Sequence, residues 1–331
     1  MSTLSAMPRR SALPRVNVLS SHRLGRVEAR VFAPSAIQSA RSYHLLARRL
    51  SCARAQPDVE KVGVVVPTYN SARTIAACLA SLRAQTTRCQ IVVVDNHSVD
   101  ETVAIAKPLV DHLLIRGPER SAQRNAGAAL LTCDVIGFID SDMTLAPAVV
   151  SEVVTAVQSG AVAVVVPERT IGRGFWATVR AFERAFYVGD PNIEAARFFN
   201  RDVFVQLGGF DETLTGPEDR DLDRRARALG PLGRTTSEIE HLEDGLTFRE
   251  ACRKKAYYAP GFRAFSSKHG RPAVLQALNR RYVRQPWRLL YPHPLLGLGL
   301  LALKGGEITM MVRALAQVSG PARSERRGRD L

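Results

Sequence analysis

Residues 61–70 read KVGVVVPTYN, and this stretch decides the fold class. The apolar run at 62–66 is short and unbroken and ends at Pro67, which is typical of a strand buried on both faces of a parallel sheet. Further apolar runs with an equally abrupt end follow at 91–94 and 135–139. The sequence therefore indicates a sheet of buried parallel strands.

Helical and strand patterns alternate along the middle of the chain, which predicts a doubly wound, mostly parallel α/β sheet. In such a sheet, right-handed crossovers place ligands at the carboxyl ends of the strands. The patterns predict strands at 62–66, 91–94, 112–115, 135–139, 161–166 and 195–199, and helices at 71–85, 100–107, 120–130, 145–158, 202–207, 218–229 and 247–258.

Polar side chains follow three of these strands. They are Thr68, Tyr69 and Asn70 after the first strand, Asp95 after the second, and Asp140 and Asp142 after the fourth. Because the carboxyl ends of parallel strands meet at one edge, we expect these side chains in one crevice. The sequence carries neither GxGxxG nor GxxxxGK[ST] after the first strand, which argues against a dinucleotide-binding fold and a P-loop nucleoside triphosphatase.

The chain of 331 residues is strongly basic, with a net charge of +15. Such a balance favours polyanions: nucleic acid, anionic lipid or phosphorylated ligands. Residues 1–57 hold ten arginines and a single acid, Glu28. We interpret them as a disordered extension without an apolar face to bury, and a transit peptide and an over-long start are the alternatives. The five cysteines form no CxxC pair, which indicates reduced thiols in a cytoplasmic setting.

We expect three parts: a basic extension at 1–57, an α/β domain at 58–260, and a basic and apolar helical extension at 261–331. The longest uncharged stretch, 289–303, is shorter than the roughly 20 residues that a membrane-spanning helix needs. Four arginines lie beside it at 280–288. The stretch therefore fits an interfacial helix at a membrane surface, and a helix packed on the domain is the alternative.

Three sets of polar residues can carry chemistry. Asp140 and Asp142 can both reach one divalent cation, and helix capping is the alternative for this pair. The acids from Glu218 to Asp223 exceed what a helix N-terminus needs, so one of them can accept a proton from an attacking hydroxyl group. His241 follows this acidic segment as a candidate metal ligand, with a purely structural role as the alternative.

Seven short motifs occur in order along the chain. They are VVVPTYN at 64–70, VVVDNHSVD at 92–100, QRNAG at 123–127, DSD at 140–142, LGGFDE at 207–212, PEDRDL at 217–222 and HLE at 241–243. In this order and spacing they resemble the motifs of the family 2 glycosyltransferases, which are inverting enzymes. The resemblance covers about residues 61–258 and implies a GT-A fold with a smaller acceptor-side region.

The resemblance also implies a role for each matching position. Pro67, Thr68, Tyr69 and Asn70 would line the nucleotide, and Asp95 would hydrogen-bond its base, most often uracil. Arg124 and Asn125 would lie near the donor's phosphates or sugar, Asp140 would face the ribose and the metal, and Glu218 would belong to the nucleotide-sugar site. Asp140, Asp142 and His241 would hold Mn²⁺ or Mg²⁺, and Asp219 would be the catalytic base.

The expected reaction is metal-dependent transfer of a sugar from a nucleotide sugar, in this family most often a UDP-sugar, to an acceptor hydroxyl group. One base and no covalent intermediate predict inversion at the anomeric carbon. The apolar C-terminus and the aromatic stripe from Phe175 to Phe186 favour a lipid-linked acceptor or a cell-envelope glycan at the cytoplasmic face of a membrane, and packing in the protein core is the alternative for each feature.

Three alternatives remain open. A sugar nucleotidyltransferase would need a Gly-rich phosphate loop after the first strand, where this chain has Pro67 and Thr68. A basic protein that binds nucleic acid or membranes without catalysis would explain the charge, but the sequence shows no recognised nucleic-acid motif, and we expect no nucleic-acid partner. A catalytically silent family member would lack the acids and the histidine that are present here.

Overall fold

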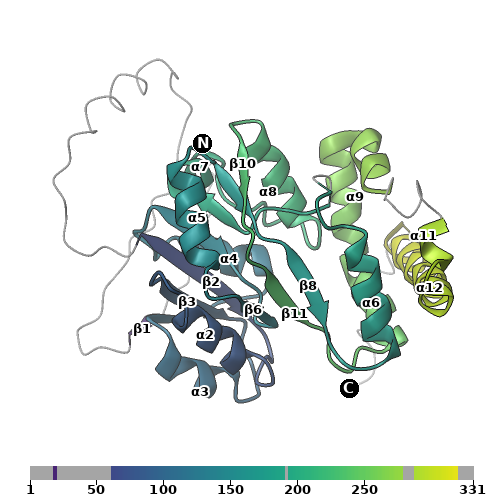
Figure 1. Cartoon of the computed structure of the whole chain (residues 1–331), viewed down its shortest axis with the longest axis horizontal. Helices are drawn as coiled ribbons and strands as arrows, with labels where there is room; N and C mark the ends of the chain where they lie inside the picture. Colours follow the sequence, from purple (N-terminus) through teal and green to yellow (C-terminus); the bar gives the residue numbers. More distant parts are fainter. Residues whose placement is uncertain (1–17, 21–60, 191–192, 279–286, 320–331) are drawn as a thin grey trace, which may run out of the picture.

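The computed structural model describes residues 18–20, 61–190, 193–278 and 287–319. Two sheets with helices around them form an α/β domain, and a group of helices from the C-terminal third lies at one end of it (Figure 1). Within the predicted extension at 1–57, the described residues are Val18–Ser20 (β1), which pair antiparallel with β4 (His112–Ile115). This short strand departs from the disorder predicted for 1–57, and the other residues of that segment lie outside the described ranges.

The central sheet has the strand order β1-β4-β3-β2-β5-β9-β7-β10. Its middle is parallel, because β2 pairs in parallel with β3 and β5, and β3 with β4. β9 runs antiparallel to its neighbours β5 and β7, as β1 does to β4 at the edge of the sheet. Besides β1 and β4, the strands are β2 (Val62–Thr68), β3 (Gln90–Asp95), β5 (Val135–Phe138), β7 (Ala163–Val165), β9 (Phe198–Asn200) and β10 (Leu232–Arg234). All residues of β2 are buried, so the mostly parallel sheet built on this apolar run is confirmed.

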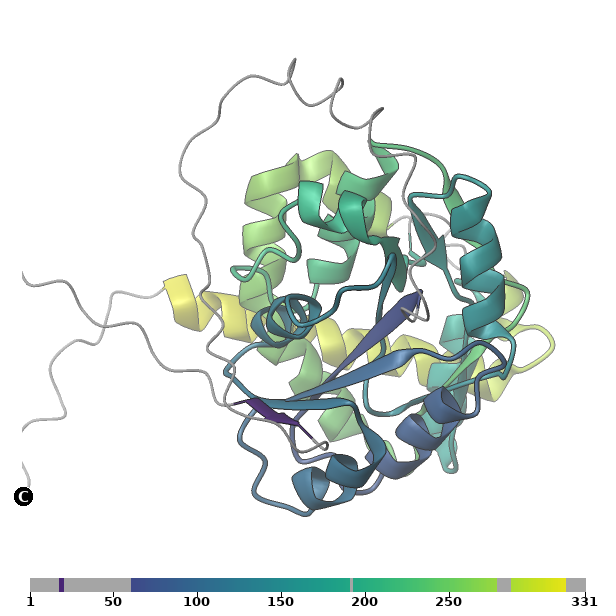
Figure 2. The same ribbon diagram turned by 90° about the vertical axis from the view of Figure 1, so that its left-hand side faces the viewer.

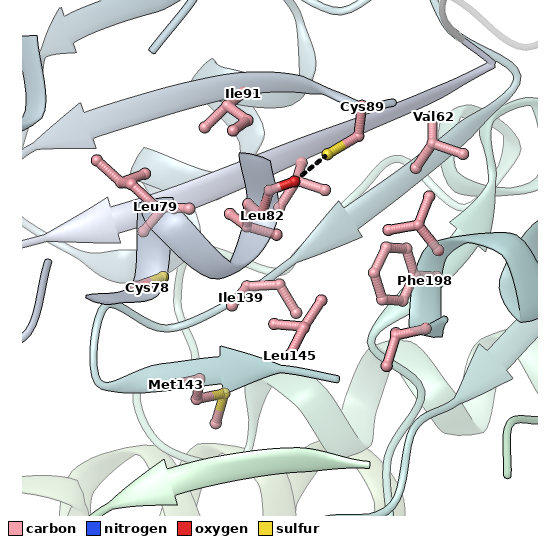
Figure 3. Close-up of a cluster of buried hydrophobic side chains, with 14 of the residues drawn as sticks. Val62, Cys78, Leu79, Leu82, Cys89, Ile91, Ile139, Met143, Leu145 and Phe198 are labelled. Carbon is pink, nitrogen blue, oxygen red and sulfur yellow. Dashed lines mark hydrogen bonds between the residues drawn. The ribbon is translucent and has the colours of Figure 1, made fainter. Parts of the chain in front are cut away.

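Helices cover both faces of the central sheet, as the alternating pattern predicts. One face packs against α2, α3 and α5, and the opposite face packs against α4, α7 and α8. These helices are α2 (Ile75–Arg83), α3 (Thr102–Ala106) with the short 3₁₀ helix η1 (Lys107–Leu109), α4 (Arg120–Ala128), α5 (Val149–Gln158), α7 (Arg201–Gln206) and α8 (Glu218–Arg227). Figure 3 shows the core of the first face, where Leu79 and Leu82 of α2 lie among Val62, Ile91 and Ile139 from three strand segments.

The close approach of α4 to the sheet depends on Gly127. A Cβ atom at this position would lie 2.4 Å from a methyl carbon of Val65 in β2, which no real Cβ contact tolerates. The helix therefore packs with its backbone against the strand. One turn earlier on the same helix, Arg124 is fully buried at the carboxyl end of the sheet.

A second sheet of three strands was not expected from the sequence patterns. Its order is β6-β11-β8, with β6 (Met143–Leu145), β11 (Ile239–Leu242) and β8 (Glu168–Ile171). The helix predicted at 145–158 begins only at Val149, because Met143 and Leu145 are buried and pair antiparallel with β11. This pairing sets His241 opposite Met143, next to the acidic motif at 140–142.

The helices after β11 lie along α6 (Phe175–Ala185), on the side of the domain away from α2 and α3 (Figures 1 and 2). They are α9 (Phe248–Leu278), α11 (Trp287–Leu290) and α12 (Pro294–Ser319). The domain boundary predicted at residue 260 falls inside α9, whose only break is a kink at Gly270 with φ of 77°. The helical C-terminal region itself is as predicted.

The apolar stretch predicted to end near residue 303 continues as helix to Ser319. Lys304 does not interrupt it, because its ammonium group pairs at 2.6 Å with Glu183 of α6. By length and composition, Pro294–Gln317 is the one helix among the described residues that could cross a membrane, with a mean hydropathy of 1.5. The helix is therefore longer than the uncharged stretch 289–303 from which the prediction was made.

Candidate active site

The acidic motifs meet at the carboxyl end of the central sheet. Asp140 follows β5, Asp142 precedes β6, and Asp219 lies in the first turn of α8. Arg124 of α4 joins them: its guanidinium donates to Asp140 and to Asp219, each at 2.7 Å, and lies 3.4 Å from Glu218. The structure thus brings together four positions that the sequence motifs single out.

In this cluster the negative charge of Asp140 is paired with two arginines. Arg124 is completely buried, and Asp140 is almost buried between Arg124 and Arg197, whose guanidinium lies 3.4 Å from its carboxylate. Burial by itself raises the pKa of Asp140, but the two arginines outweigh it and hold the pKa well below its usual range. Asp140 is therefore an ionised carboxylate fixed between two cations.

Arg197 and Glu168 are site residues that the sequence analysis missed. Arg197 lies 3.7 Å from Asp219 and 2.7 Å from Glu168, so it links the acidic helix to the second sheet. The signal for Arg197 was an arginine inside the short apolar pattern at 195–199. Glu168 gave no comparable signal, because its role depends on pairing with Arg197 and Arg184.

The predicted metal ligands are brought together only in part. His241 Nε2 lies 3.2 Å from an oxygen of Asp142, and His241 Nδ1 lies 3.6 Å from Glu168. Both oxygens of Asp140 are instead engaged by Arg124 and Arg197. Among the described residues, no group of three His, Cys, Asp or Glu side chains lies close enough to hold a metal ion. Asp142 and His241 therefore lie together in this structure, whereas Asp140, the third predicted ligand, is held by two arginines.

This pair nevertheless fits a divalent cation. Asp142 Oδ1 and both ring nitrogens of His241 are buried and make no hydrogen bond, although buried polar atoms normally find a partner. A carboxylate and an imidazole are suitable ligands for Mn²⁺. A cation bound between the two side chains would engage Asp142 Oδ1 and Nε2 of His241, the ring nitrogen that faces Asp142.

The predicted nucleotide-binding residues divide into exposed and buried ones. Tyr69 is 61% exposed and Asn70 is exposed, so both can contact a ligand. Pro67 and Thr68 are buried inside β2. Asp95 is buried as well, and its carboxylate accepts hydrogen bonds from the hydroxyl of Thr68 at 2.9 Å and the backbone N–H of Ser98 at 2.7 Å. In this structure Asp95 thus holds the loop after β3 and presents no free oxygen to a base.

Asn125 and Glu218 are both held by contacts within the protein. The Asn125 amide is used by the backbone of Phe210 and by Glu212, and it ties down the loop before α8. Glu218 is buried and pairs with Arg120 at 3.1 Å. Burial, together with the neighbouring Asp219, raises the pKa of Glu218. Both residues therefore stabilise the backbone and side chains around the site.

Asp219 differs from its neighbours because its side chain is 29% exposed. It lines a cavity of about 290 Å³ whose walls come from β8, α6, α8 and α9. Glu168 and Arg197 line the same cavity, which therefore adjoins the arginine–carboxylate cluster. An acceptor molecule in this cavity could reach a carboxylate able to take a proton.

Known proteins resemble the α/β part of this chain in sequence. The family model described as glycosyl transferase family 2 matches residues 63–210. Validoxylamine A glucosyltransferase of Streptomyces hygroscopicus subsp. jinggangensis is 32% identical over 112 residues, which are 31% of this chain and 26% of that protein. The uncharacterized glycosyltransferase YibD of Escherichia coli is 30% identical over 102 residues, which are 29% of this chain and 30% of that protein. The matches thus span less than a third of these curated relatives.

Among solved structures, the mannosyltransferase PcManGT of Pyrobaculum calidifontis in complex with GDP-Man and Mn²⁺ aligns with a TM-score of 0.50 at 19% identity. The alignment covers 85% of this chain and 83% of that one. At this identity the likeness concerns the fold. The predicted GT-A fold is thereby confirmed. The family model supports the predicted family over residues 63–210.

Proposed function

We propose, from the premise that this chain carries a family 2 glycosyltransferase domain with the GT-A fold, that it transfers a sugar from a nucleotide-sugar donor to an acceptor hydroxyl group. The observation that carries the proposal is the carboxylate of Asp219, which opens on a cavity and lies beside the buried cluster of Arg124, Arg197 and Asp140. A proton acceptor next to fixed cations suits displacement of an anionic leaving group.

The residues present support use of a divalent cation. Asp142 and His241 would hold Mn²⁺ or Mg²⁺ through the buried atoms that lack hydrogen bonds. Asp140 joins them only if its carboxylate leaves Arg124 or Arg197. When bound, the cation supplies Lewis-acid stabilisation of the negative charge that develops on the departing nucleoside diphosphate.

The chain's own side chains supply the remaining parts of the proposed mechanism. Asp219 accepts the proton of the acceptor hydroxyl group as the oxygen attacks the anomeric carbon. Arg197 lies 3.7 Å from Asp219 and contributes positive charge on the donor side of the site. A direct displacement of this kind inverts the anomeric configuration. Exposed Tyr69 offers a flat surface for a nucleotide base, and we propose uracil as that base.

The proposed function is tested by a donor screen. Purified chain is mixed with UDP-glucose, UDP-N-acetylglucosamine or GDP-mannose, with Mn²⁺ or with EDTA, and with or without extracted lipid. We expect release of the nucleoside diphosphate from one donor, at least tenfold faster with Mn²⁺ than with EDTA, because the cation stabilises the leaving group. In a parallel reaction with a nucleoside triphosphate and a sugar 1-phosphate, release of pyrophosphate would instead identify a sugar nucleotidyltransferase. No turnover of any nucleotide-sugar donor would contradict the proposal.

We also propose that α11 and α12 contact a membrane surface, which would suit a lipid-linked acceptor or a cell-envelope glycan. Two of the three charged side chains of α12 face the protein, where Lys304 pairs with Glu183, and Glu307 pairs with Arg180 at 2.7 Å; the third, Arg313, is exposed in the C-terminal part of the helix. The opposite face is apolar and exposed, with Trp287, Leu290, Tyr291, Leu295, Leu298, Leu301, Ile308 and Val312. A helix on a water-exposed surface normally turns its apolar side to the protein and its polar side to water. The outer side of α12 is mostly apolar, so it suits an apolar surrounding.

Replacing Leu298 and Leu301 together by Glu is expected to lower the fraction of chain bound to phosphatidylglycerol-containing vesicles at least tenfold. Each exposed leucine that enters the bilayer boundary contributes about 1.5–3 kcal/mol, and a charge there is costly. Vesicle flotation measures the bound fraction. Val205→Glu is the control, because Val205 is also an exposed apolar residue but lies on α7. Equal flotation of the double variant and the parent would contradict membrane contact through α12.

A further inference from the structure

The cavity beside Asp219 has an unusual distribution of charge. Its walls come from β8, α6, α8 and α9, and α6 and α9 belong to the helical end of the molecule (Figure 1). Every acid that lines it is ion-paired with an arginine: Glu168, Glu183, Glu194, Asp219 and Glu243. The negative charges of the wall are therefore already compensated by the protein.

Two lysines that line the cavity have no acidic ion-pair partner among the described residues. Lys254 and Lys255 are consecutive residues of α9, and both line the cavity. In the described part of the chain, neither ammonium group makes an ion pair or a hydrogen bond, whereas Lys304 nearby pairs with both Glu183 and Glu307. The cavity thus carries a surplus of positive charge at Lys254 and Lys255.

Lys254 is exposed, whereas the charge of Lys255 is costly where it lies. Lys255 is half-buried, and burial lowers its pKa to about 8, because an ammonium group in this position has lost water without gaining a counter-ion. The nearby acids Glu307 and Glu183 oppose this effect, but Arg180 and Lys304 neutralise them. An anion bound in the cavity would supply the missing partner.

We propose that this cavity is the acceptor site and that it selects an acceptor carrying an anionic group, such as a phosphate, which Lys254 and Lys255 bind. Because Asp219 lines the same cavity, one molecule can present its hydroxyl group to the base and its anion to the lysines. The volume of about 290 Å³ suits a phosphorylated headgroup. This inference rests on the proposed function and adds the chemical class of the acceptor.

Calorimetry on the full chain saturated with Mn²⁺ and a nucleoside diphosphate tests this proposal, because the diphosphate already occupies the donor side. Glycerol 3-phosphate is the probe and glycerol its neutral counterpart. We expect the parent to bind glycerol 3-phosphate at least tenfold more tightly than glycerol. Lys254→Met combined with Lys255→Met is expected to weaken that binding at least tenfold, and Lys255→Arg to preserve it. Arg253→Met is the matched control, since Arg253 is the preceding residue of α9, exposed, and does not line the cavity.

A second arm identifies the source of the anion. Vesicles with phosphatidic acid are compared with phosphatidylcholine vesicles for the parent and the double lysine variant. Lysine-dependent binding of glycerol 3-phosphate indicates a soluble phosphorylated acceptor, and lysine-dependent binding of the phosphatidic acid vesicles alone indicates a lipid headgroup. Equal binding by parent and double variant in both arms overturns the proposal. Because the readout is binding, a failed donor screen with intact lysine-dependent binding would contradict the proposed function and leave this site standing.

Discussion

Replacing Asp219 by Asn is expected to slow sugar transfer by about 10³-fold, because a positioned general base contributes roughly 10²–10⁴-fold to such reactions. The amide keeps the size of the side chain and can still accept a hydrogen bond from Arg124, which lies 2.7 Å from Asp219. It cannot take a proton from the acceptor. Single-turnover transfer with the donor selected by the screen measures the chemical step.

The same variant should leave donor binding almost unchanged. Of the proposed cation ligands, His241 lies in β11 and Asp142 directly precedes β6, so neither lies on α8. Manganese-dependent binding of the nucleoside diphosphate, measured by calorimetry, is therefore expected to stay within threefold of the parent. Asp202→Asn is the control, because Asp202 is an exposed acid in the first turn of another helix, α7. Transfer by Asp219→Asn at the rate of the parent would show that another group is the base.

The parts of the fold that were predictable are those with strong local patterns. β2 was identified from one continuous apolar run, because a strand covered by helices on both faces needs no polar side. The second sheet was not predictable, since its strands have only three or four residues each. Their existence depends on pairing between β6 and β11, which lie almost a hundred residues apart in the sequence. Local periodicity carries no information about such pairing.

In the site, too, the contacts between residues far apart in the sequence could not be predicted. The motifs identified Asp140, Asp142, Asp219 and His241 as polar residues at one edge, and the structure gathers them there. They did not reveal that Arg197 would form an ion pair with Asp140, because that contact depends on the antiparallel pairing of β9 with β5. Nor did they reveal that Ser98 would donate a hydrogen bond to the carboxylate of Asp95, whose contact with a base stays a prediction.

Replacing Arg124 by Met is expected to lower the free energy of unfolding by about 3–5 kcal/mol, the usual cost of removing one partner from a buried ionic network. Arg124 is fully buried and is the contact shared by Asp140, Asp219 and Glu218. Without it, Asp140 keeps only Arg197 at 3.4 Å, and Glu218 keeps Arg120 at 3.1 Å. Urea unfolding measures the change. Arg83→Met is the control, because Arg83 pairs with Asp111 at 3.1 Å but both side chains are more than a third exposed, and such pairs contribute about 0–1 kcal/mol.

The pH dependence separates lost charge pairing from lost packing. The pKa of Asp140 in the folded parent lies well below its ordinary value of 3.8, so the stability it contributes is present above that value and is lost as the pH falls through the folded pKa. Removing Arg124 raises the folded pKa towards the unfolded one and removes this contribution. The difference in unfolding free energy between parent and Arg124→Met should therefore be largest near pH 7 and shrink as the pH falls below about 4. A difference that stays constant from pH 7 to pH 3 would mean that Arg124 stabilises the site by filling space against Phe210, whose ring centre lies 5.1 Å from its guanidinium carbon, and not by its charge.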